Sequence, residues 1–177
     1  MKPENMKCVS VALARAACAG LILGVLAWSP PAARAASPGS EVGVTRKVGI
    51  GFIVGEPTGL SGKYWLTRTE AMDFGAAWSF VDESSFHIHA DYLVHDFSLF
   101  TVDHGRMPLY YGIGGRLKFA DQSRLGVRGV IGLDFITDGA PVDVFAEIAP
   151  VLDLVPRTDF TLMGGVGVRI YFAPSWQ

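Results

Sequence analysis

Residues 71–81 read AMDFGAAWSFV, and residues 86–96 read FHIHADYLVHD. In both stretches apolar side chains occupy nearly every second position, and the positions between them hold mainly small, acidic or histidine residues. A period of two places alternate side chains on opposite faces of a β-strand. The turn-forming residues 82–85 separate the two stretches, which therefore predict two antiparallel strands joined by a tight turn.

The same alternation continues on both sides of this predicted hairpin. Segments of about ten residues with this pattern and short turns are typical of outer-membrane strands, and eight is the smallest usual strand number. We therefore predict an all-β protein, an eight-stranded antiparallel up-and-down transmembrane β-barrel. Its expected strands span residues 48–54, 60–66, 71–81, 86–96, 108–119, 125–135, 142–152 and 160–172.

The connections between the predicted strands are short, with one exception. If both chain ends are periplasmic, the longest connection, residues 97–107, falls on the periplasmic side, although outer-membrane barrels usually carry their longer loops outside. Either the strand count is wrong or the surface loops are unusually short, and short loops weaken an adhesin interpretation. The outside turns would be residues 56–59, 82–85, 120–124 and 155–159.

The N-terminal stretch has the features of a signal peptide. Lys2 and Lys7 precede an apolar run that is densest over residues 16–28, and an Ala-Arg-Ala cleavage pattern follows at residues 33–35. The alternative is an uncleaved membrane anchor, for which the run is short. We expect a signal peptide over 1–35 cleaved near Ala35 or Ala36, a polar lead-in over 36–45, the barrel over 46–172 and a tail over 173–177.

Composition restricts the chemistry of the chain from residue 36 onward. Both cysteines, Cys8 and Cys18, precede this point, so disulfides and sulfur-ligated zinc are excluded after it. The totals of 15 Lys+Arg and 17 Asp+Glu include four basic residues and one acidic residue before residue 36, which leaves 11 and 16 and a net charge of −5. This acidic balance predicts no nucleic-acid partner. No remaining segment approaches the roughly 18–20 apolar residues of a membrane helix.

The two faces of the predicted strands differ as a membrane barrel requires. One face is apolar and rich in aromatic residues, and the other carries glycines and charges of both signs. Paired charges are tolerable in a narrow lumen, where unpaired charges are costly. A soluble periplasmic sandwich or lipocalin-like barrel is the alternative. The predicted lumen polar network is Lys63, Asp73, His87, His89, Asp91, Arg116, Lys118, Arg128, Asp134, Asp143, Glu147 and Arg169.

The last predicted strand resembles the C-terminal assembly signal of bacterial outer-membrane proteins. Gly167, Ile170 and Phe172 carry this pattern, although residues 173–177 follow the final aromatic residue. The resemblance implies recognition by the barrel-insertion machinery and periplasmic chaperones. It also implies contact with outer-membrane lipid and lipopolysaccharide in the mature state.

Four further runs resemble one family. They are GEPTGLSGKYWL at 55–66, HADYL at 89–93 with His95, YYGIGGR at 110–116, and APVDVFAE at 140–147. Together they resemble small spirochaete-type outer-membrane β-barrels of unknown function, which also occur in other Gram-negative bacteria. Their architecture is similar to OmpX and the OmpA membrane domain. The resemblance implies a bacterial outer-membrane location and brings no established catalytic residues.

Three ionisable residues, His87, His89 and Asp91, share one face of a predicted strand. Residues two apart on a strand lie about 6.6 Å apart, so a shared metal would need side chains that converge from other strands. We interpret these residues as lumen-filling groups that pair with Arg116 or Arg128. We therefore expect no metal and no cofactor.

A second set of polar residues could suggest a lipid-acting serine hydrolase. Asp82, Ser84, Ser85 and His87 lie close together in the sequence, but geometry rather than proximity defines such a site. His87 is expected to point into the lumen, whereas a lipid-acting site would open toward the bilayer.

Six aromatic residues are interpreted as interfacial girdles and core filling rather than ligand-stacking groups: Trp65, Trp78, Phe80, Tyr92, Tyr110 and Tyr111.

An eight-stranded barrel has an interior just wide enough to be filled by side chains. With Phe145 and Tyr171 inside, we expect no sizeable pore. We predict a non-catalytic outer-membrane barrel with a structural role or a surface-interaction role, the latter with an extracellular protein ligand that the sequence does not identify. The alternatives are a lipid-modifying outer-membrane hydrolase and a small lipid- or ligand-binding periplasmic barrel.

Overall fold

The structure is a computed structural model that describes residues 41–173 except 57, 80–84 and 120–122. The side chains of Ser79 and Ser85 are also undescribed. The predicted signal peptide, the first part of the lead-in and residues 174–177 of the tail therefore lie outside the described residues. Among the described residues, no helix has the length and hydropathy of a membrane span.

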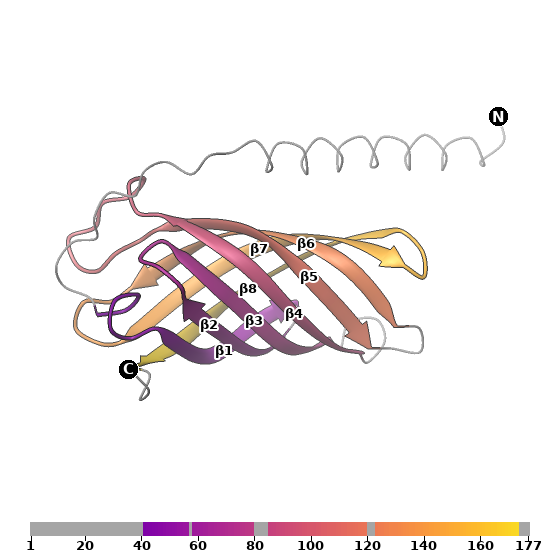
Figure 1. The fold of residues 1–177 in the computed structure, drawn as a ribbon, viewed down its shortest axis with the longest axis horizontal. Coiled ribbons are helices and arrows are strands. Elements are labelled where there is room, and N and C mark those ends of the chain that lie inside the picture. Colours follow the sequence, from indigo (N-terminus) through magenta and orange to yellow (C-terminus); the bar gives the residue numbers. More distant parts are fainter. Residues whose placement is uncertain (1–40, 57, 80–84, 120–122, 174–177) are drawn as a thin grey trace. The chain divides into compact units, whose positions relative to one another are not determined.

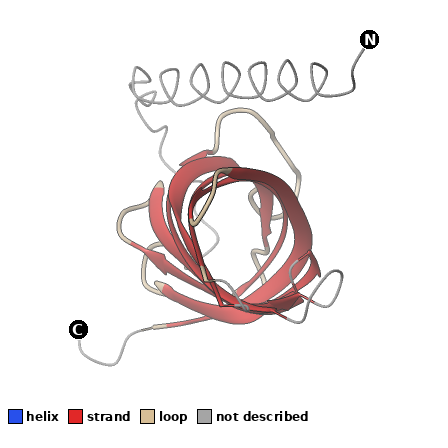
Figure 2. Ribbon diagram, turned by 90° about the vertical axis from the view of Figure 1, so that its right-hand side faces the viewer, coloured by secondary structure: helices blue, strands red, loops and turns tan. Residues whose placement is uncertain are grey.

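Eight antiparallel strands close into one barrel, and each strand pairs with its neighbours in sequence (Figure 1). The view along the barrel shows the strands as a closed ring (Figure 2). The ring is closed by the pairing of the first strand with the last. The predicted all-β, eight-stranded, antiparallel up-and-down barrel is confirmed. The strands are β1 (Val48–Glu56), β2 (Thr58–Trp65), β3 (Glu70–Ser79), β4 (Ser85–Asp96), β5 (Leu109–Phe119), β6 (Arg124–Ile136), β7 (Val142–Val155) and β8 (Asp159–Phe172).

The hairpin that decided the fold shows how the register follows from the pattern. Asp73 of β3 lies opposite Asp91 of β4, and Gly75 lies opposite His89. These four residues are buried inside the barrel. Because a slip of one residue would turn every side chain to the other face, the alternation fixes the register wherever the two faces differ this strongly.

Strand β7 continues beyond its predicted end at residue 152. It reaches Val155, and Val151 and Asp153 are both buried on the inner face. A register shift lies between Leu125 and Gly126 of the partner strand β6, so that Gly126 pairs with Asp153. The inward alternation therefore extends one step further than expected, and Asp153 joins the interior.

The two ends of the barrel differ in their connections. The connections after β2, β4 and β6 lie at the end where β1 begins and β8 ends, here called the terminal end (Figure 1). The longest one, residues 97–108, is among them. At the opposite or far end, the connections are one, five, four and three residues long. The strand count was therefore right, and the far-end turns are short.

A small apolar cluster closes the terminal end. Residues 41–46 form a turn in which Gly43 N donates to Arg46 O at 3.0 Å, and Val42 is only 1% exposed. Val42 packs in a cluster with Trp65, Ala71, Ile136 and Tyr171. The predicted lead-in is therefore not a free polar segment in the part that the structure describes, because residues 41–46 pack against the barrel mouth.

The long connection holds this turn in place. Arg106 Nη2 donates to the Val42 carbonyl oxygen at 2.7 Å, and its guanidinium lies 5.3 Å from the Phe97 ring centroid. Arg106 also exchanges backbone hydrogen bonds with Ile136 at 2.8 Å. Burial lowers the pKa of Arg106, and the carboxylate of Asp138 opposes that shift. The terminal mouth is thus covered by two segments that contact each other.

Candidate functional site in the barrel interior

The ionisable side chains of the strands gather inside the barrel. Every member of the predicted lumen network is buried except Lys118, which is half-buried near the far end of β5. Among the described side chains, no ion pair includes Lys118. The interior residues form two groups, which differ in how completely their polar atoms are paired.

The terminal cluster comprises Lys63, Asp134, Asp143 and Arg169. Lys63 Nζ donates to Asp134 Oδ2 at 2.5 Å. Arg169 donates from Nη2 to Asp134 Oδ1 at 3.0 Å, and from Nε to both oxygens of Asp143 at 3.1 Å. Its Nη1 donates to Asp73 Oδ1 at 2.6 Å. One guanidinium therefore uses all three of its nitrogens on three carboxylates, which is the geometry that favours arginine over lysine.

Aromatic and imidazole rings pack around the terminal cluster. The Arg169 guanidinium lies 3.9 Å from the centroid of the Phe145 ring, and Tyr171 Oη donates to Asp143 Oδ2 at 2.6 Å. His95 Nε2 lies 3.1 Å from Lys63 Nζ. The centroids of the His95 and Trp65 rings are 4.4 Å apart. The buried charges of this cluster are therefore paired and enclosed by rings.

The histidine cluster comprises His87, His89, Asp91, Arg116 and Arg128, and it extends from the barrel centre toward the far end. Arg128 bridges two carboxylates, donating from Nη1 to Asp91 Oδ2 and from Nη2 to Glu147 Oε1. Several other polar atoms of this cluster are buried and have no hydrogen-bond partner in the described part of the chain: His87 Nε2, His89 Nδ1, Asp91 Oδ1, Arg116 Nε and Arg128 Nε.

Arg116 forms the fully buried ion pair of the histidine cluster that lies toward the far end. It donates from Nη2 to both oxygens of Asp153, at 2.7 and 2.8 Å, and from Nη1 to Met163 Sδ at 3.1 Å. Arg124 lies at the rim, and its Nη1 is 3.6 Å from Asp153 Oδ2. Sequence reasoning missed Asp153 and Met163 as interior residues. Both share the inward parity of their strands, so extending the alternation by one step would have identified Asp153.

Glycines on neighbouring strands make room for the two central acid and imidazole groups. A Cβ atom on Gly75 would lie 2.1 Å from His89 Cε1, and one on Gly114 would lie 2.1 Å from Asp91 Oδ1. Neither distance is sterically possible. The glycine-rich inner face is thus a packing requirement, since any larger residue would displace the His89 ring or the Asp91 carboxylate.

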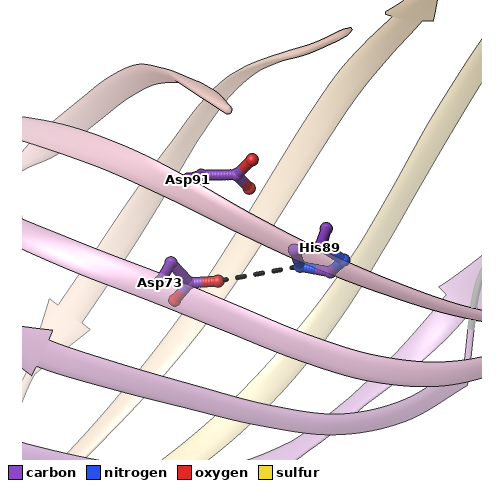
Figure 3. A group of neighbouring side chains, drawn as sticks. All are labelled: Asp73, His89 and Asp91. Carbon is purple, nitrogen blue, oxygen red and sulfur yellow. Dashed lines mark ion pairs between the residues drawn. The ribbon is translucent and has the colours of Figure 1, made fainter. Parts of the chain in front are cut away.

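Asp73, His89 and Asp91 meet at the boundary between the two groups. Each of them offers one ligand atom, and these atoms all lie within 4.8 Å of one another. Figure 3 shows Asp73 on one strand facing His89 of the next, with the Asp91 carboxylate beside them. The strand-to-strand convergence that a shared metal would need is therefore present, whereas the sequence analysis singled out only His87, His89 and Asp91, which all lie on β4.

The other sequence-based candidates divide between the two faces. Trp65 and Tyr110 are interior residues, each 1% exposed, whereas Trp78 and Tyr92 are exposed on the outer wall. Tyr111 is half-buried, and Phe80 lies outside the described residues. In the hydrolase hypothesis, His87 is buried inside the barrel. Asp82 and Ser84 of that hypothesis, and the side chain of Ser85, are undescribed.

Comparison with known proteins gives a fold and no family. No protein-family model and no curated protein matches the chain. A crystal structure of the N-terminal β-barrel domain of Pseudomonas aeruginosa OprF is similar, with a TM-score of 0.51 and 16% sequence identity. The match covers 71% of this chain and 96% of that domain. At this identity the likeness shows a shared eight-stranded barrel architecture, and the resemblance to a spirochaete-type family stays a prediction.

Proposed function

We propose that the protein is an integral outer-membrane β-barrel with a structural or surface-interaction role, without catalytic activity and without a sizeable pore. The observation that carries this proposal is the sidedness of the wall. Large apolar side chains are exposed on the outer wall of the barrel in all eight strands. The charged side chains that are not at a strand end lie inside the barrel. Soluble monomers rarely expose contiguous apolar patches larger than a few hundred Å².

The outer wall lacks charge over most of its height. Within the described strands, the charged residues at outward-facing positions are Glu56, Glu70 and Asp96, and each is the first or last residue of its strand. Between these ends, side chains such as Phe52 and Leu162 are 63% and 62% exposed. Such a wall suits hydrocarbon, because it offers lipid no charge to solvate and no unpaired strand edge.

The height of this wall and its aromatic rows support the same environment. A ten-residue strand tilted by about 40° rises roughly 25 Å, the height of the apolar band in outer-membrane barrels. At the far end, Trp78, Phe86 and Phe119 follow one another across three strands, with ring centroids 5.5 and 6.2 Å apart. At the terminal end Phe172 is 50% exposed. Aromatic residues at both ends are typical of membrane–water interfaces.

The expected export route and partners belong to this proposal. The predicted signal peptide would deliver the chain to the periplasm, where chaperones and the barrel-insertion machinery would read the final strand. There Ile170 and Phe172 are 51% and 50% exposed on the outer wall. Gly167 faces inward beneath the Phe145 ring, which a Cβ would approach to 2.4 Å. Lipid and lipopolysaccharide would then surround the wall.

The absence of a sizeable pore is inferred from the filled interior. Trp65, Tyr110 and Tyr171 are each at most 1% exposed, and the terminal cluster spans the interior with its ion pairs. The Val42 turn and Arg106 cover the terminal mouth. These side chains occupy the path that water or an ion would follow.

Heat-modifiable gel migration tests the membrane proposal. Protein taken from fractionated envelopes should migrate faster unboiled than boiled, because a folded barrel resists detergent until it is heated. It should also remain with the membranes after a carbonate wash. Recovery as a soluble, detergent-free mature protein would contradict the proposal and favour a periplasmic carrier, and steady conductance steps in planar bilayers would contradict the closed interior.

A further inference from the structure

The centre of the barrel holds more negative than positive charge. Ion pairs connect three buried cations, Lys63, Arg128 and Arg169, to five buried carboxylates. With the neighbouring histidines neutral, this group carries a net charge of −2. The buried carboxylates are Asp73, Asp91, Asp134, Asp143 and Glu147.

Of the other buried cations in the described chain, Arg106 lies at the terminal mouth, where it donates to the Val42 carbonyl oxygen. Arg116 already pairs with Asp153, while Arg124 and Lys118 lie at the rim, where they are partly exposed. An uncompensated charge in an apolar enclosure is costly. If all five carboxylates are ionised, the network is short of two positive charges, which either bound protons or a bound cation can supply; the arrangement of the side chains around the excess points to a cation.

Asp73, His89 and Asp91 have the arrangement of a ligand set. The register places Asp73 opposite Asp91 on adjacent strands, and His89 lies two residues along the same face. His89 Nε2 is 3.9 Å from Asp73 Oδ2, which is too long for a hydrogen bond. Ligands of one tetrahedral zinc ion lie about 3.3 Å apart, as bonds of about 2.0–2.1 Å require. A contraction of less than about 1 Å would bring the two atoms into one coordination sphere.

Arginines hold one oxygen of each carboxylate and leave the other available. Arg169 holds Asp73 Oδ1 at 2.6 Å, and Arg128 holds Asp91 Oδ2. Asp91 Oδ1 and His89 Nδ1 are buried without a hydrogen-bond partner in the described chain. Hydrogen bonds of this kind orient the carboxylates of metal sites from the second coordination sphere.

We propose that Asp73, His89 and Asp91 bind one divalent transition-metal ion of the zinc class inside the barrel. The ion takes His89 Nε2 and one oxygen from each carboxylate, and water completes its coordination. Its two charges neutralise the excess of the central network. One imidazole with two carboxylates favours zinc over magnesium and calcium, which prefer oxygen-only ligand sets. The site does not depend on the membrane proposal.

Zinc titration of the folded, metal-stripped full-length protein tests the site. We expect one equivalent of Zn²⁺ to bind at least 100-fold more tightly than Mg²⁺ or Ca²⁺, and to raise the temperature at which the barrel unfolds on gels. His89→Gln should weaken Zn²⁺ binding by at least 100-fold, more than the roughly 10- to 100-fold that loss of an outer-sphere partner causes. His104→Gln, at an exposed position of the connection 97–108, should bind Zn²⁺ as the unaltered protein does.

Asp73→Asn provides a second arm, which is read only in protein whose heat-modifiable migration shows a folded barrel. It should also abolish Zn²⁺ binding, but it alters a partner of Arg169 and could prevent folding. Co²⁺ absorption therefore gives an independent readout, with a visible band in the unaltered protein and in His104→Gln but not in His89→Gln. The proposal is overturned by the absence of stoichiometric Zn²⁺ binding, by equal affinity for Mg²⁺, or by unchanged Zn²⁺ binding in His89→Gln. The first result would mean that bound protons supply the missing charge.

Discussion

The two groups of interior charges use the same residue types but differ in how their atoms are paired. In the terminal cluster, every nitrogen of Lys63 and Arg169 has a carboxylate or imidazole partner. In the histidine cluster, one nitrogen each of His87, His89, Arg116 and Arg128 has none among the described residues. Buried polar groups are normally satisfied. The charges of the terminal cluster are therefore fully paired, whereas the histidine cluster keeps buried polar atoms, including Asp91 Oδ1, without a partner in the described chain.

Replacing one arginine in each cluster should separate the clusters most clearly. Arg169→Met leaves three buried carboxylates without their shared cation and should lower the free energy of unfolding by about 3–5 kcal/mol. Arg116→Met should cost less, because Arg124 remains 3.6 Å from Asp153. Urea unfolding in lipid vesicles, followed by tryptophan fluorescence, measures both values. Equal losses would contradict the distinction between the clusters.

A charge on the outer wall tests the surroundings that both clusters share. Ile131 lies at the middle of β6 and is 48% exposed. Ile131→Arg should destabilise the barrel by about 2–4 kcal/mol, whereas Leu66→Arg, just beyond β2, should cost about 0–1 kcal/mol. The same vesicle unfolding assay applies. If the central charge proved as harmless as the terminal one, hydrocarbon could not surround the wall.

Two histidines allow the same substitution on each side of the comparison. His95 contacts Lys63, Asp134 and the Thr69 carbonyl oxygen, so His95→Leu should leave buried partners unsatisfied and cost about 1–3 kcal/mol. His87 makes no hydrogen bond in the described chain, and His87→Leu should change stability by less than about 1 kcal/mol. Thermal midpoints from heat-modifiable migration rank the two variants, and a reversed order would refute the assignment.

The smallest effect concerns the turn that covers the terminal end. Val42 is 1% exposed and Val44 is 40% exposed in the same turn. Val42→Ala removes buried apolar contacts and should cost about 1.5 kcal/mol, while Val44→Ala should stay within about 0.5 kcal/mol. Equilibrium unfolding of both variants distinguishes a packed plug from a loose lead-in. Indistinguishable variants would mean that the turn does not seal the mouth.

The alternation predicted the barrel because one face of each strand differs from the other at almost every step. It placed Arg169 and Asp134 on the inner face for the same reason. It missed Asp153, because the predicted strand ended at residue 152, ahead of the turn predicted at 155–159, while the inward pattern continued through a register shift. Val42 was missed because a tertiary contact with Trp65, and no local period, buries it.

The candidate site was harder to predict because it depends on side chains from two strands. Asp73, His89 and Asp91 could each be assigned to the inner face, but the predicted turn at residues 82–85 would pair residue 81 with residue 86 and so place Asp73 opposite Val94. The structure instead pairs Ser79 with Ser85, and this register places Asp73 opposite Asp91. The distances among the three ligand atoms, and the arginines that orient the carboxylates, follow from strand coiling and packing that periodicity does not encode.

Collision accessibility of a spin label tests the sidedness of the wall most directly. Ile148 lies near the middle of β7 and is 54% exposed, and Thr67 lies in an exposed connection. In a Cys8→Ser, Cys18→Ser background, a label at Ile148→Cys in vesicles should collide frequently with oxygen and rarely with a water-soluble nickel chelate. A label at Thr67→Cys should show the opposite. Frequent nickel collisions at residue 148, equal to those at residue 67, would contradict a lipid-facing wall.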